Sequence, residues 1–210
     1  MSRRLVLWRH GLTDWNVQGR LQGQSDVPLN EVGEQQARDA GARLAALAPA
    51  RIVSSDLVRA RETARALADL VGLEVETDER LREMNFGERE GLTMEETVAR
   101  FPDQVATFMS DDDVRMPGAE LYVEAAERFA TGLDEIVAAM GEDDTTVVVA
   151  HGAVLRVGIC SFLGFPRQTW RSFGGFNNCS WTVLEQLRGR WRIAEWNAGT
   201  LPEPVLSDDR

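Results

Sequence analysis

The chain has 210 residues and a formal net charge of −11, and all 23 of its basic residues are arginines. A strongly acidic surface repels nucleic acid and anionic membranes, so we expect neither as a partner. The absence of lysine excludes enzymes that depend on a phosphate-loop lysine, a Schiff base or a lysine base. With 43% hydrophobic residues, the chain has enough apolar side chains for a single domain over residues 1–210.

The first apolar run and the two cysteines indicate the cellular compartment of the protein. The apolar run before Arg9 is only four residues long, too short for a signal peptide or a membrane span, so we expect a cytoplasmic protein. Cys160 and Cys179 lie among apolar residues without metal or redox spacing. They are therefore expected to be buried thiols, with no disulfide.

The N-terminal segment predicts a strand, a loop and a helix. The run from Arg4 to Trp8 is too short for a helix and indicates a buried strand that ends in the polar triplet Arg9-His10-Gly11. A loop follows to about Pro28, and Asn30 is a suitable N-cap for a helix that ends near Pro49. Spacings of three and four predict its inner face as Val32, Gln36, Ala40, Arg43, Leu44 and Leu47.

A second strand-loop-helix unit comes next. Residues 51–54 indicate a short strand, with Ser55-Asp56 as the cap of a helix over residues 57–71. A third short strand is expected at about 73–77. The composition then changes, and residues 84–118, which include the run Asp111-Asp112-Asp113, are expected to form a small lid insertion.

The remaining elements complete an α/β pattern. An amphipathic helix is expected over 120–140, and the apolar strand 145–150 ends in His151-Gly152 before a helix that reaches Leu163. Residues 180–187 and 190–196 flank Arg188-Gly189 and indicate an antiparallel hairpin. We therefore expect a three-layer α/β/α sandwich around a mainly parallel sheet, with an irregular tail after Gly199. A homodimer through the hairpin is left open.

The two histidines of the chain, His10 and His151, each follow a predicted strand directly and precede a glycine. Ligands of parallel α/β sheets bind beyond the carboxyl ends of the strands, so both imidazoles are expected on one rim. Arg9 accompanies the first histidine, and Arg59 lies in the first turn of the helix after the second strand. Two guanidiniums and two imidazoles around a helix N-terminus suit a phosphoryl group.

With these features the sequence resembles the histidine phosphatase superfamily, which includes the cofactor-dependent phosphoglycerate mutases. The resemblance covers most of the chain in the order of the family, and the late run Asn178-Cys179-Ser180 also fits. The matching blocks are Arg9-His10-Gly11-Leu12-Thr13 with Asn16; Pro28-Leu29, Gly33 and Gln36-Ala37; Ser54-Ser55-Asp56-Leu57 with Arg59-Ala60 and Thr63-Ala64; Leu81-Arg82-Glu83 with Gly87; and His151-Gly152 with Leu155-Arg156.

The resemblance implies a mechanism that needs neither metal nor cofactor. His10 would attack phosphorus and become phosphorylated, while Arg9, Arg59 and His151 hold the phosphoryl oxygens. Glu83 would protonate the leaving group and later activate water, a role that calls for a carboxyl group with a raised pKa. The resemblance also assigns substrate contacts to Asn16, Gln22, Gly23 and Gly152.

Several alternatives stay open at the level of sequence. Glu88 and Glu90 are rivals of Glu83 for the acid, and the triple aspartate is either a solvated loop or a cation site. The family often has Gly-Gly-Glu-Ser where this chain has Gly118-Ala119-Glu120-Leu121, so a hydroxyl at the pocket edge is missing.

The substrate is expected to be a small phosphomonoester. Between Gly91 and Glu120 the lid carries Arg100 and Arg115 against several carboxylates and has no lysine, which does not suit a second anion and favours a hydrolase over a phosphoglycerate mutase. The run from Asn178 and the tryptophans Trp181, Trp191 and Trp196 resemble actinobacterial glucosyl-3-phosphoglycerate phosphatases. Broad-specificity phosphatase activity, or a noncatalytic phosphate-binding module on the same fold, are the alternatives.

Overall fold

Six strands form one sheet in a computed structural model that describes residues 3–110 and 113–199. The strand order is β3-β2-β4-β1-β5-β6, in which the first four strands run parallel and β5 and β6 run antiparallel to their neighbours. The sheet therefore has the mainly parallel order that the sequence predicted. The strands are β1 (Arg4–Arg9), β2 (Arg51–Ser54), β3 (Val75–Thr77), β4 (Thr145–Ala150), β5 (Trp181–Leu187) and β6 (Arg190–Ala198).

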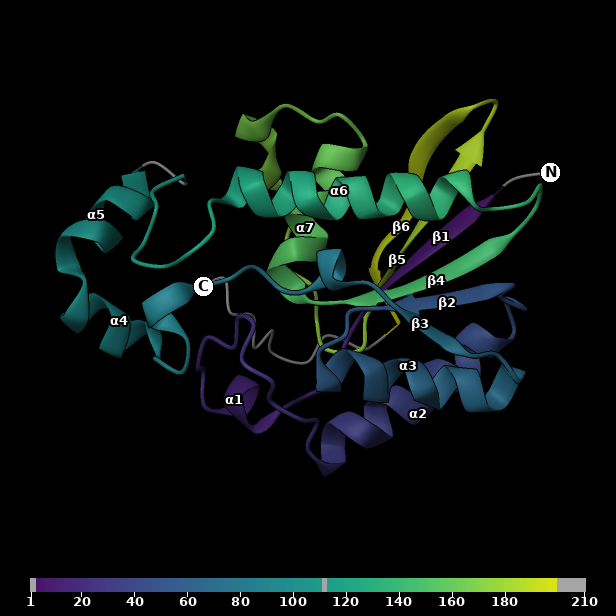
Figure 1. Ribbon diagram of the computed structural model, residues 1–210, viewed down its shortest axis with the longest axis horizontal. Helices are drawn as coiled ribbons and strands as arrows, with labels where there is room; N and C mark the ends of the chain where they lie inside the picture. The colour runs from purple at the N-terminus through teal and green to yellow at the C-terminus, as the bar shows by residue number, and fades with distance from the viewer. Residues whose placement is uncertain (1–2, 111–112, 200–210) are drawn as a thin grey trace.

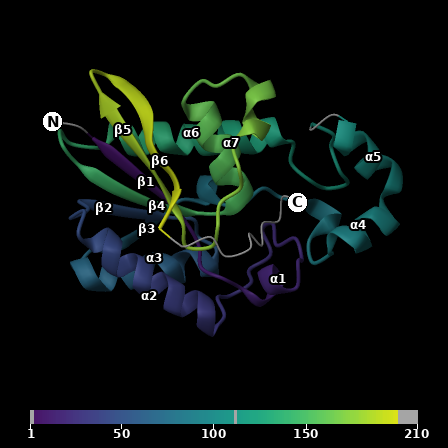
Figure 2. The same cartoon turned by 180° about the vertical axis from the view of Figure 1, so that it is seen from behind.

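Helices cover both faces of this sheet, as Figures 1 and 2 show from opposite sides. The residues of β1 alternate between the two faces: Val6 and Trp8 pack toward one helical layer, while Leu5 and Leu7 pack toward the other. The three-layer sandwich predicted from the sequence is thus confirmed. One layer consists of α2 (Glu31–Ala45) and α3 (Val58–Val71), and the other of α6 (Tyr122–Ala138) and α7 (Gly152–Phe162).

The lid segment, residues 84–118, contains helices that the sequence did not indicate. They are α4 (Met94–Arg100) and α5 (Pro102–Ser110), which extend beyond one end of the sheet in Figure 1. Phe101, Met116 and Ala119 form a small apolar cluster of their own within this segment. Asp111 and Asp112 lie outside the described residues, as does the tail after Gly199.

The long N-terminal loop also differs from expectation, because it contains the short helix α1 (Asp14–Val17). Thr13 and Asn16 close a reciprocal capping box that stabilises this turn. An isolated bridge joins Arg20 to Thr93, and the Arg20 side chain pairs with Glu96 at 2.8 Å. The N-terminal loop is therefore attached to the first lid helix.

The predicted inner face of α2 is partly wrong. Val32 and Arg43 are exposed, and the buried side of the helix consists of small residues with Leu44. A Cβ on Gly41 would lie 3.1 Å from the carbonyl oxygen of Ala66 in α3, so the two helices pack with their backbones close together. Close packing selects glycine and alanine, which a search for large apolar residues undervalues.

The predicted cap of α3 is also wrong. The N-cap residue is Leu57, which offers no side-chain acceptor, and the N–H of Val58 donates instead to Asp26 at 2.6 Å. Ser55 Oγ accepts from the Leu57 N–H at 3.3 Å, one residue before the helix begins. A carboxylate from the distant N-terminal loop therefore supplies the cap and ties this loop to the start of α3.

The C-terminal hairpin is present as predicted. Arg188 and Gly189 have φ angles of 51° and 76°, and positive φ at both central residues is the requirement of a type I′ turn. Trp191 and Trp196 pack against the core with aromatic neighbours such as Phe162 and Phe176. Within the described ranges, no helix is long and apolar enough to cross a membrane.

Candidate active site

The two histidines lie side by side at the carboxyl ends of the central strands. In the parallel pairing of β1 with β4, Arg9 lies opposite Ala150, so His10 and His151 leave the sheet at the same level. Their ring centroids are 5.2 Å apart and the rings are tilted by 57°. Both residues are buried, at 2% and 0% exposure. The expectation that the histidines share one rim is confirmed.

The hydrogen bonds of His10 define its tautomer. Its Nδ1 lies 2.7 Å from the Gly11 carbonyl oxygen, which only accepts, so Nδ1 carries the proton. The Nε2 atom therefore keeps its lone pair. Burial, followed by the charges of Arg59 and Arg9, holds the pKa of His10 well below its ordinary value. His10 is thus a neutral imidazole whose Nε2 is unprotonated.

The proton of His151 is on the opposite ring nitrogen. Arg59 Nε donates to His151 Nδ1 at 3.1 Å, so the proton is on Nε2, which donates to Ser55 Oγ at 2.8 Å. Burial, followed by Arg59 and then His10, lowers the pKa of His151 well below its ordinary value. Both ring nitrogens of His151 are therefore hydrogen-bonded, Nδ1 as an acceptor and Nε2 as a donor. Sequence reasoning placed Ser55 at a helix start and missed this contact.

Two buried guanidiniums flank the imidazoles. Arg9 donates through Nη1 to the Phe176 carbonyl, while its Nε and Nη2 have no hydrogen-bond partner among the described residues. A Cβ on Gly152 would lie 3.3 Å from the Arg9 guanidinium, so the glycine gives this side chain its room. Arg59 donates to the carbonyl oxygens of Ser25 and Gly23 at 2.8 and 2.7 Å. The centre of an acidic protein is therefore locally positive.

Two buried amides add further polar groups. Asn16 accepts through Oδ1 from Thr13 N–H at 3.2 Å, and its Nδ2 has no partner in the parts of the chain that the structure describes. Neither polar atom of the Gln22 side chain has a partner there, although this residue is only 1% exposed. Buried donors are costly unless they are satisfied. Together with Arg9, such donors suit the oxygens of a tetrahedral anion.

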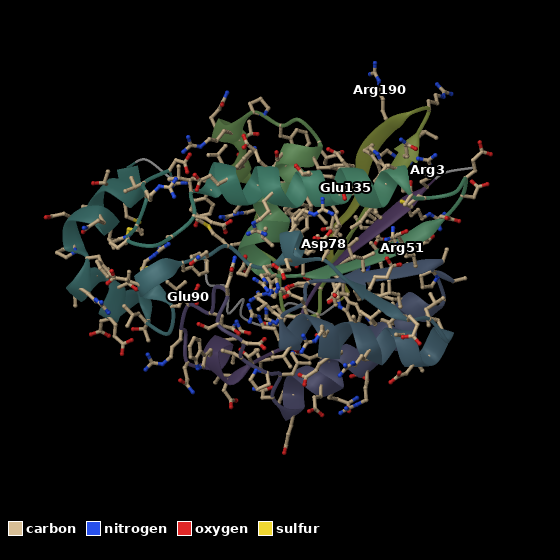
Figure 3. The ribbon with its side chains drawn as sticks, viewed as in Figure 1. Arg3, Arg51, Asp78, Glu90, Glu135 and Arg190 are labelled. Atoms are coloured by element: carbon tan, nitrogen blue, oxygen red, sulfur yellow. The ribbon has the colours of Figure 1, made fainter. Side chains whose placement is uncertain are left out.

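Gly23, next to Gln22, adopts a conformation that needs glycine. Its φ is +53°, and a Cβ would lie 2.1 Å from Glu90 Oε1. Glu90 accepts from Gln24 N–H at 2.9 Å and from Ser25 Oγ at 2.6 Å. Glu90 thus holds the loop from one side while Arg59 holds it from the other, and Figure 3 labels Glu90 on the side of the site nearest the lid.

Glu83 lies at the N-terminus of α7, beside the His151-Gly152 turn. Its Oε1 accepts from Met84 and Val154 N–H, both at 2.8 Å, and its Oε2 accepts from Ala153 N–H at 3.1 Å. The residue is 2% exposed. These donors fix the orientation of the carboxyl group. The raised pKa expected from the sequence stays a prediction.

The two rival carboxylates are engaged elsewhere. Glu88 is exposed and pairs with Arg100 at 2.7 Å, and Glu90 is used by the loop contacts described above. Glu83 is therefore the glutamate that the structure places next to the histidine rim. Of the run Asp111-Asp112-Asp113, the structure describes Asp113. It accepts from the Tyr122 N–H at 3.0 Å and pairs with Arg167. In the described ranges, no group of three His, Cys, Asp or Glu side chains is arranged to hold a metal ion.

Asn178 is a supporting residue whose contacts the sequence did not reveal. Its Nδ2 lies within 3.2 Å of the His10 carbonyl, 3.1 Å of the Gly11 carbonyl and 3.2 Å of Asn16 Oδ1. Cys179 N–H also donates to the His10 carbonyl at 3.1 Å. The segment before β5 therefore supports the loop that carries His10. The resemblance of Asn178-Cys179-Ser180 to the family pointed to this position, but it did not indicate which groups Asn178 contacts.

Comparisons with known proteins agree with this geometry. Residues 5–199 match the model of the histidine phosphatase superfamily (branch 1). The chain is 39% identical to a glucosyl-3-phosphoglycerate phosphatase of Mycobacterium tuberculosis over 94% of this chain and 95% of that protein. It is 35% identical to a probable phosphoglycerate mutase of Erwinia tasmaniensis, over 91% and 89% of the two chains.

A solved structure extends the similarity to the fold. A mycobacterial glucosyl-3-phosphoglycerate phosphatase in complex with VO3 superposes with a TM-score of 0.87 at 41% identity, covering 94% of this chain and 100% of that one. The strand-end histidines, the buried arginines and the extent of these matches lead to one conclusion. The chain belongs to the histidine phosphatase superfamily.

Proposed function

We propose that the protein hydrolyses a small phosphomonoester through a phosphohistidine formed on His10. The observation that carries this proposal is the neutral imidazole of His10, whose Nε2 keeps its lone pair beside His151 and two buried guanidiniums. Such a nitrogen is a nucleophile at neutral pH. The surrounding donors stabilise the negative charge that develops on the phosphoryl oxygens.

In the first step, Nε2 of His10 bonds to phosphorus as the bond from phosphorus to the leaving oxygen breaks. Arg9, Arg59 and His151 bind the equatorial oxygens, and Asn16 donates through its amide. Protonated Glu83 gives its proton to the leaving alkoxide, which departs as an alcohol.

In the second step, Glu83 takes a proton from water as the oxygen of that water attacks phosphorus. The bond between nitrogen and phosphorus breaks, inorganic phosphate leaves, and Glu83 is protonated again. Gln22 and Gly23 contact the substrate from the N-terminal loop, while Gly152 lets Arg9 approach closely. Each step uses groups of this chain.

Glucosyl-3-phosphoglycerate is the substrate we favour. The relatives with this activity in their names share 38–39% of their residues with the chain. Between Gly91 and Glu120, Arg100 pairs with Glu88 and Arg115 pairs with Glu124 at 2.5 Å, so both cations of this stretch are neutralised by carboxylates. A mutase must retain a bisphosphorylated intermediate, for which such a lid offers little positive charge. Phosphoglycerate mutase is the second candidate, because a relative with that name is 35% identical.

The function is tested with a panel of phosphomonoesters that includes glucosyl-3-phosphoglycerate and 3-phosphoglycerate, with and without a chelator. We expect release of phosphate in both conditions and an acid-labile phosphoryl label on the wild type, and both should be lost in His10→Ala. Loss of turnover in chelator, or undiminished turnover by His10→Ala, would contradict the mechanism. Formation of 2-phosphoglycerate would indicate a mutase, and binding without turnover a noncatalytic module.

A further inference from the structure

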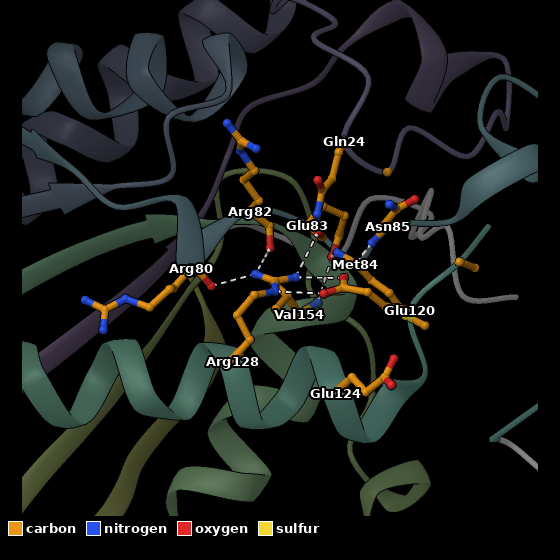
Figure 4. Close-up of polar contacts among 12 residues, drawn as sticks. Gln24, Arg80, Arg82, Glu83, Met84, Asn85, Glu120, Glu124, Arg128 and Val154 are labelled. Carbon is orange, nitrogen blue, oxygen red and sulfur yellow. Dashed lines mark hydrogen bonds and ion pairs between the residues drawn. The ribbon is translucent and has the colours of Figure 1, made fainter. Parts of the chain in front are cut away.

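A bidentate ion pair holds the irregular segment that carries Glu83. Arg128, on α6, donates through Nε and Nη2 to the two carboxylate oxygens of Glu120, each at 2.9 Å. The side chains are only 21% and 22% exposed. Figure 4 shows this pair between the helix and the backbone of residues 80–85. Its location on the inner side of the segment distinguishes it from the exposed pairs of the lid.

Arg128 also binds the backbone of this segment. Its Nη1 donates to the carbonyl oxygens of Arg80 at 2.6 Å and Arg82 at 3.0 Å, and its Nη2 lies 3.3 Å from the carbonyl oxygen of Glu83. Residues 82–86 belong to no helix or strand, so no regular ladder satisfies these carbonyls. The single guanidinium group of Arg128 therefore supplies these carbonyl oxygens with hydrogen bonds.

Glu120 completes the attachment from the other side. Its Oε2 accepts from Asn85 N–H at 2.8 Å, and its own N–H donates to the Asn85 carbonyl at 2.9 Å. The backbone on both sides of Glu83 is thus fixed to α6, while the carboxyl group of Glu83 is fixed to α7. Gln24 Nε2 adds one more donor to the Glu83 carbonyl, at 3.2 Å.

We propose that Arg128 and Glu120 are positioning residues that set where Glu83 delivers its proton. This inference rests on the proposed function, in which Glu83 is the acid. Neither member of the pair makes a hydrogen bond to either histidine among the described residues, although the charge of Arg128 contributes to the lowered pKa of His151. The effect on Glu83 passes through the backbone of residues 80–85. Proton transfer is sensitive to displacements of about 1 Å, which cost roughly a hundredfold in rate. A loosened segment should therefore weaken acid catalysis and leave attack by His10 intact.

Two substrates with different leaving groups separate these effects. An aryl phosphate such as p-nitrophenyl phosphate needs little protonation of its leaving group, whereas an alkyl phosphate needs it strongly. For Arg128→Met we expect kcat/KM to fall by about tenfold or more with the alkyl phosphate and by less than about threefold with the aryl phosphate. Glu120→Gln should shift the ratio in the same direction, and Arg128→Lys should restore part of it.

The ratio of the two kcat/KM values is the decisive measurement, because a partly unfolded variant loses active enzyme for both substrates equally. Glu135→Gln is the matched control: Glu135 lies on the same helix and, among the described residues, pairs with the Arg80 side chain at the surface, at 65% exposure. Its ratio should equal that of the wild type. An equal loss on both substrates in Arg128→Met would overturn the proposal.

A double variant provides the second test. In Glu83→Gln there is no acid left to position, so adding Arg128→Met should leave the ratio unchanged. A further change in the ratio would show that Arg128 acts elsewhere. Failure of the proposed function is distinguishable, since Glu83→Gln alone would then affect both substrates alike.

Discussion

His10 and His151 carry their protons on opposite nitrogens, although burial lowers the pKa of both. A carbonyl acceptor fixes the proton of His10 on Nδ1, and a guanidinium donor fixes that of His151 on Nε2. His10 Nε2 therefore keeps its lone pair, whereas His151 Nε2 carries a proton. The two histidines are the same residue type, and their different tautomers result from their immediate neighbours.

The tautomers can be measured directly because the chain has only two histidines. We expect the ¹⁵N spectrum of the imidazoles to show neutral rings at pH 6.5, with Nδ1–H for His10 and Nε2–H for His151. Arg9→Met removes a positive charge beside His10, so the pKa of His10 should rise toward its ordinary value. A protonated wild-type ring at pH 6.5, or an unchanged His10 titration in Arg9→Met, would contradict this electrostatic account.

The sequence predicted the residues whose positions follow from strand ends, and it missed those whose partners are distant. His10 and His151 were placed correctly because parallel strands end on one rim. Asn178 and Arg128 contact backbone atoms 167 and 45 or more residues away. A donor that reaches a carbonyl leaves no pattern of spacing or hydrophobicity at either end. Such contacts can be identified only in the folded structure.

The helix α2 supports the loop that carries His10, through an unusually close backbone contact. A Cβ on Gly33 would lie 2.0 Å from the Leu12 carbonyl oxygen, and a Cβ on Gly11 would lie 2.4 Å from the Gly33 carbonyl oxygen. Gln36 accepts from Leu12 N–H at 2.9 Å, and Asn30 N–H donates to the Leu12 carbonyl at 3.0 Å. The start of α2 is therefore part of the support of the active site.

Gly33→Ala should displace this loop. We expect a loss of about 1–3 kcal/mol in the free energy of unfolding, because the new methyl group collides with backbone that cannot rotate away. Since the collision is one residue from Gly11, kcat/KM should fall as well. Gly174→Ala is the control, because a Cβ there meets nothing within 4 Å. Denaturant unfolding and turnover measured together check this, and a Gly33→Ala variant that is as active and stable as wild type would contradict it.

At the scale of elements, the sequence predicted strands better than helix surfaces. The strands 51–54 and 145–150 were predicted with their observed bounds, since short apolar runs between polar turns have few alternatives. The lid helices α4 and α5 were missed because their composition indicated a loop. The inner face of α2 was misassigned because Gly33 and Gly41 carry no hydrophobic signal.

The two layers of helices enclose an interior that holds both histidines in their neutral form. Each has a pKa lowered by folding, so it binds fewer protons in the folded chain than in the unfolded chain near pH 6. Their contribution to stability is therefore fully present above about pH 6.5 and is lost as the pH falls. This contribution belongs to the whole molecule, because both rings become fully exposed to water only when the chain unfolds.

We expect the free energy of unfolding to fall between pH 6.5 and 5 by up to about 1.4 kcal/mol per pH unit for each histidine. His10→Gln removes one of the two titrating groups, so the slope should be roughly halved. Chemical denaturation at several pH values measures both slopes. A wild-type slope near zero in this range would show that the histidines are protonated in the folded state, contrary to the environment described for them.

The burial of the cysteines has a consequence for redox chemistry. Cys179 is fully buried beside the loop of His10 and Cys160 lies in the core, and burial raises the pKa of both thiols, that of Cys160 to about 11. Oxidants attack thiolates, which neither cysteine forms at neutral pH. Because the chain also has no lysine, its nucleophilic chemistry rests on an imidazole that mild peroxide leaves intact. We expect an enzyme built in this way to keep its activity in peroxide concentrations that inactivate phosphatases with a catalytic thiolate.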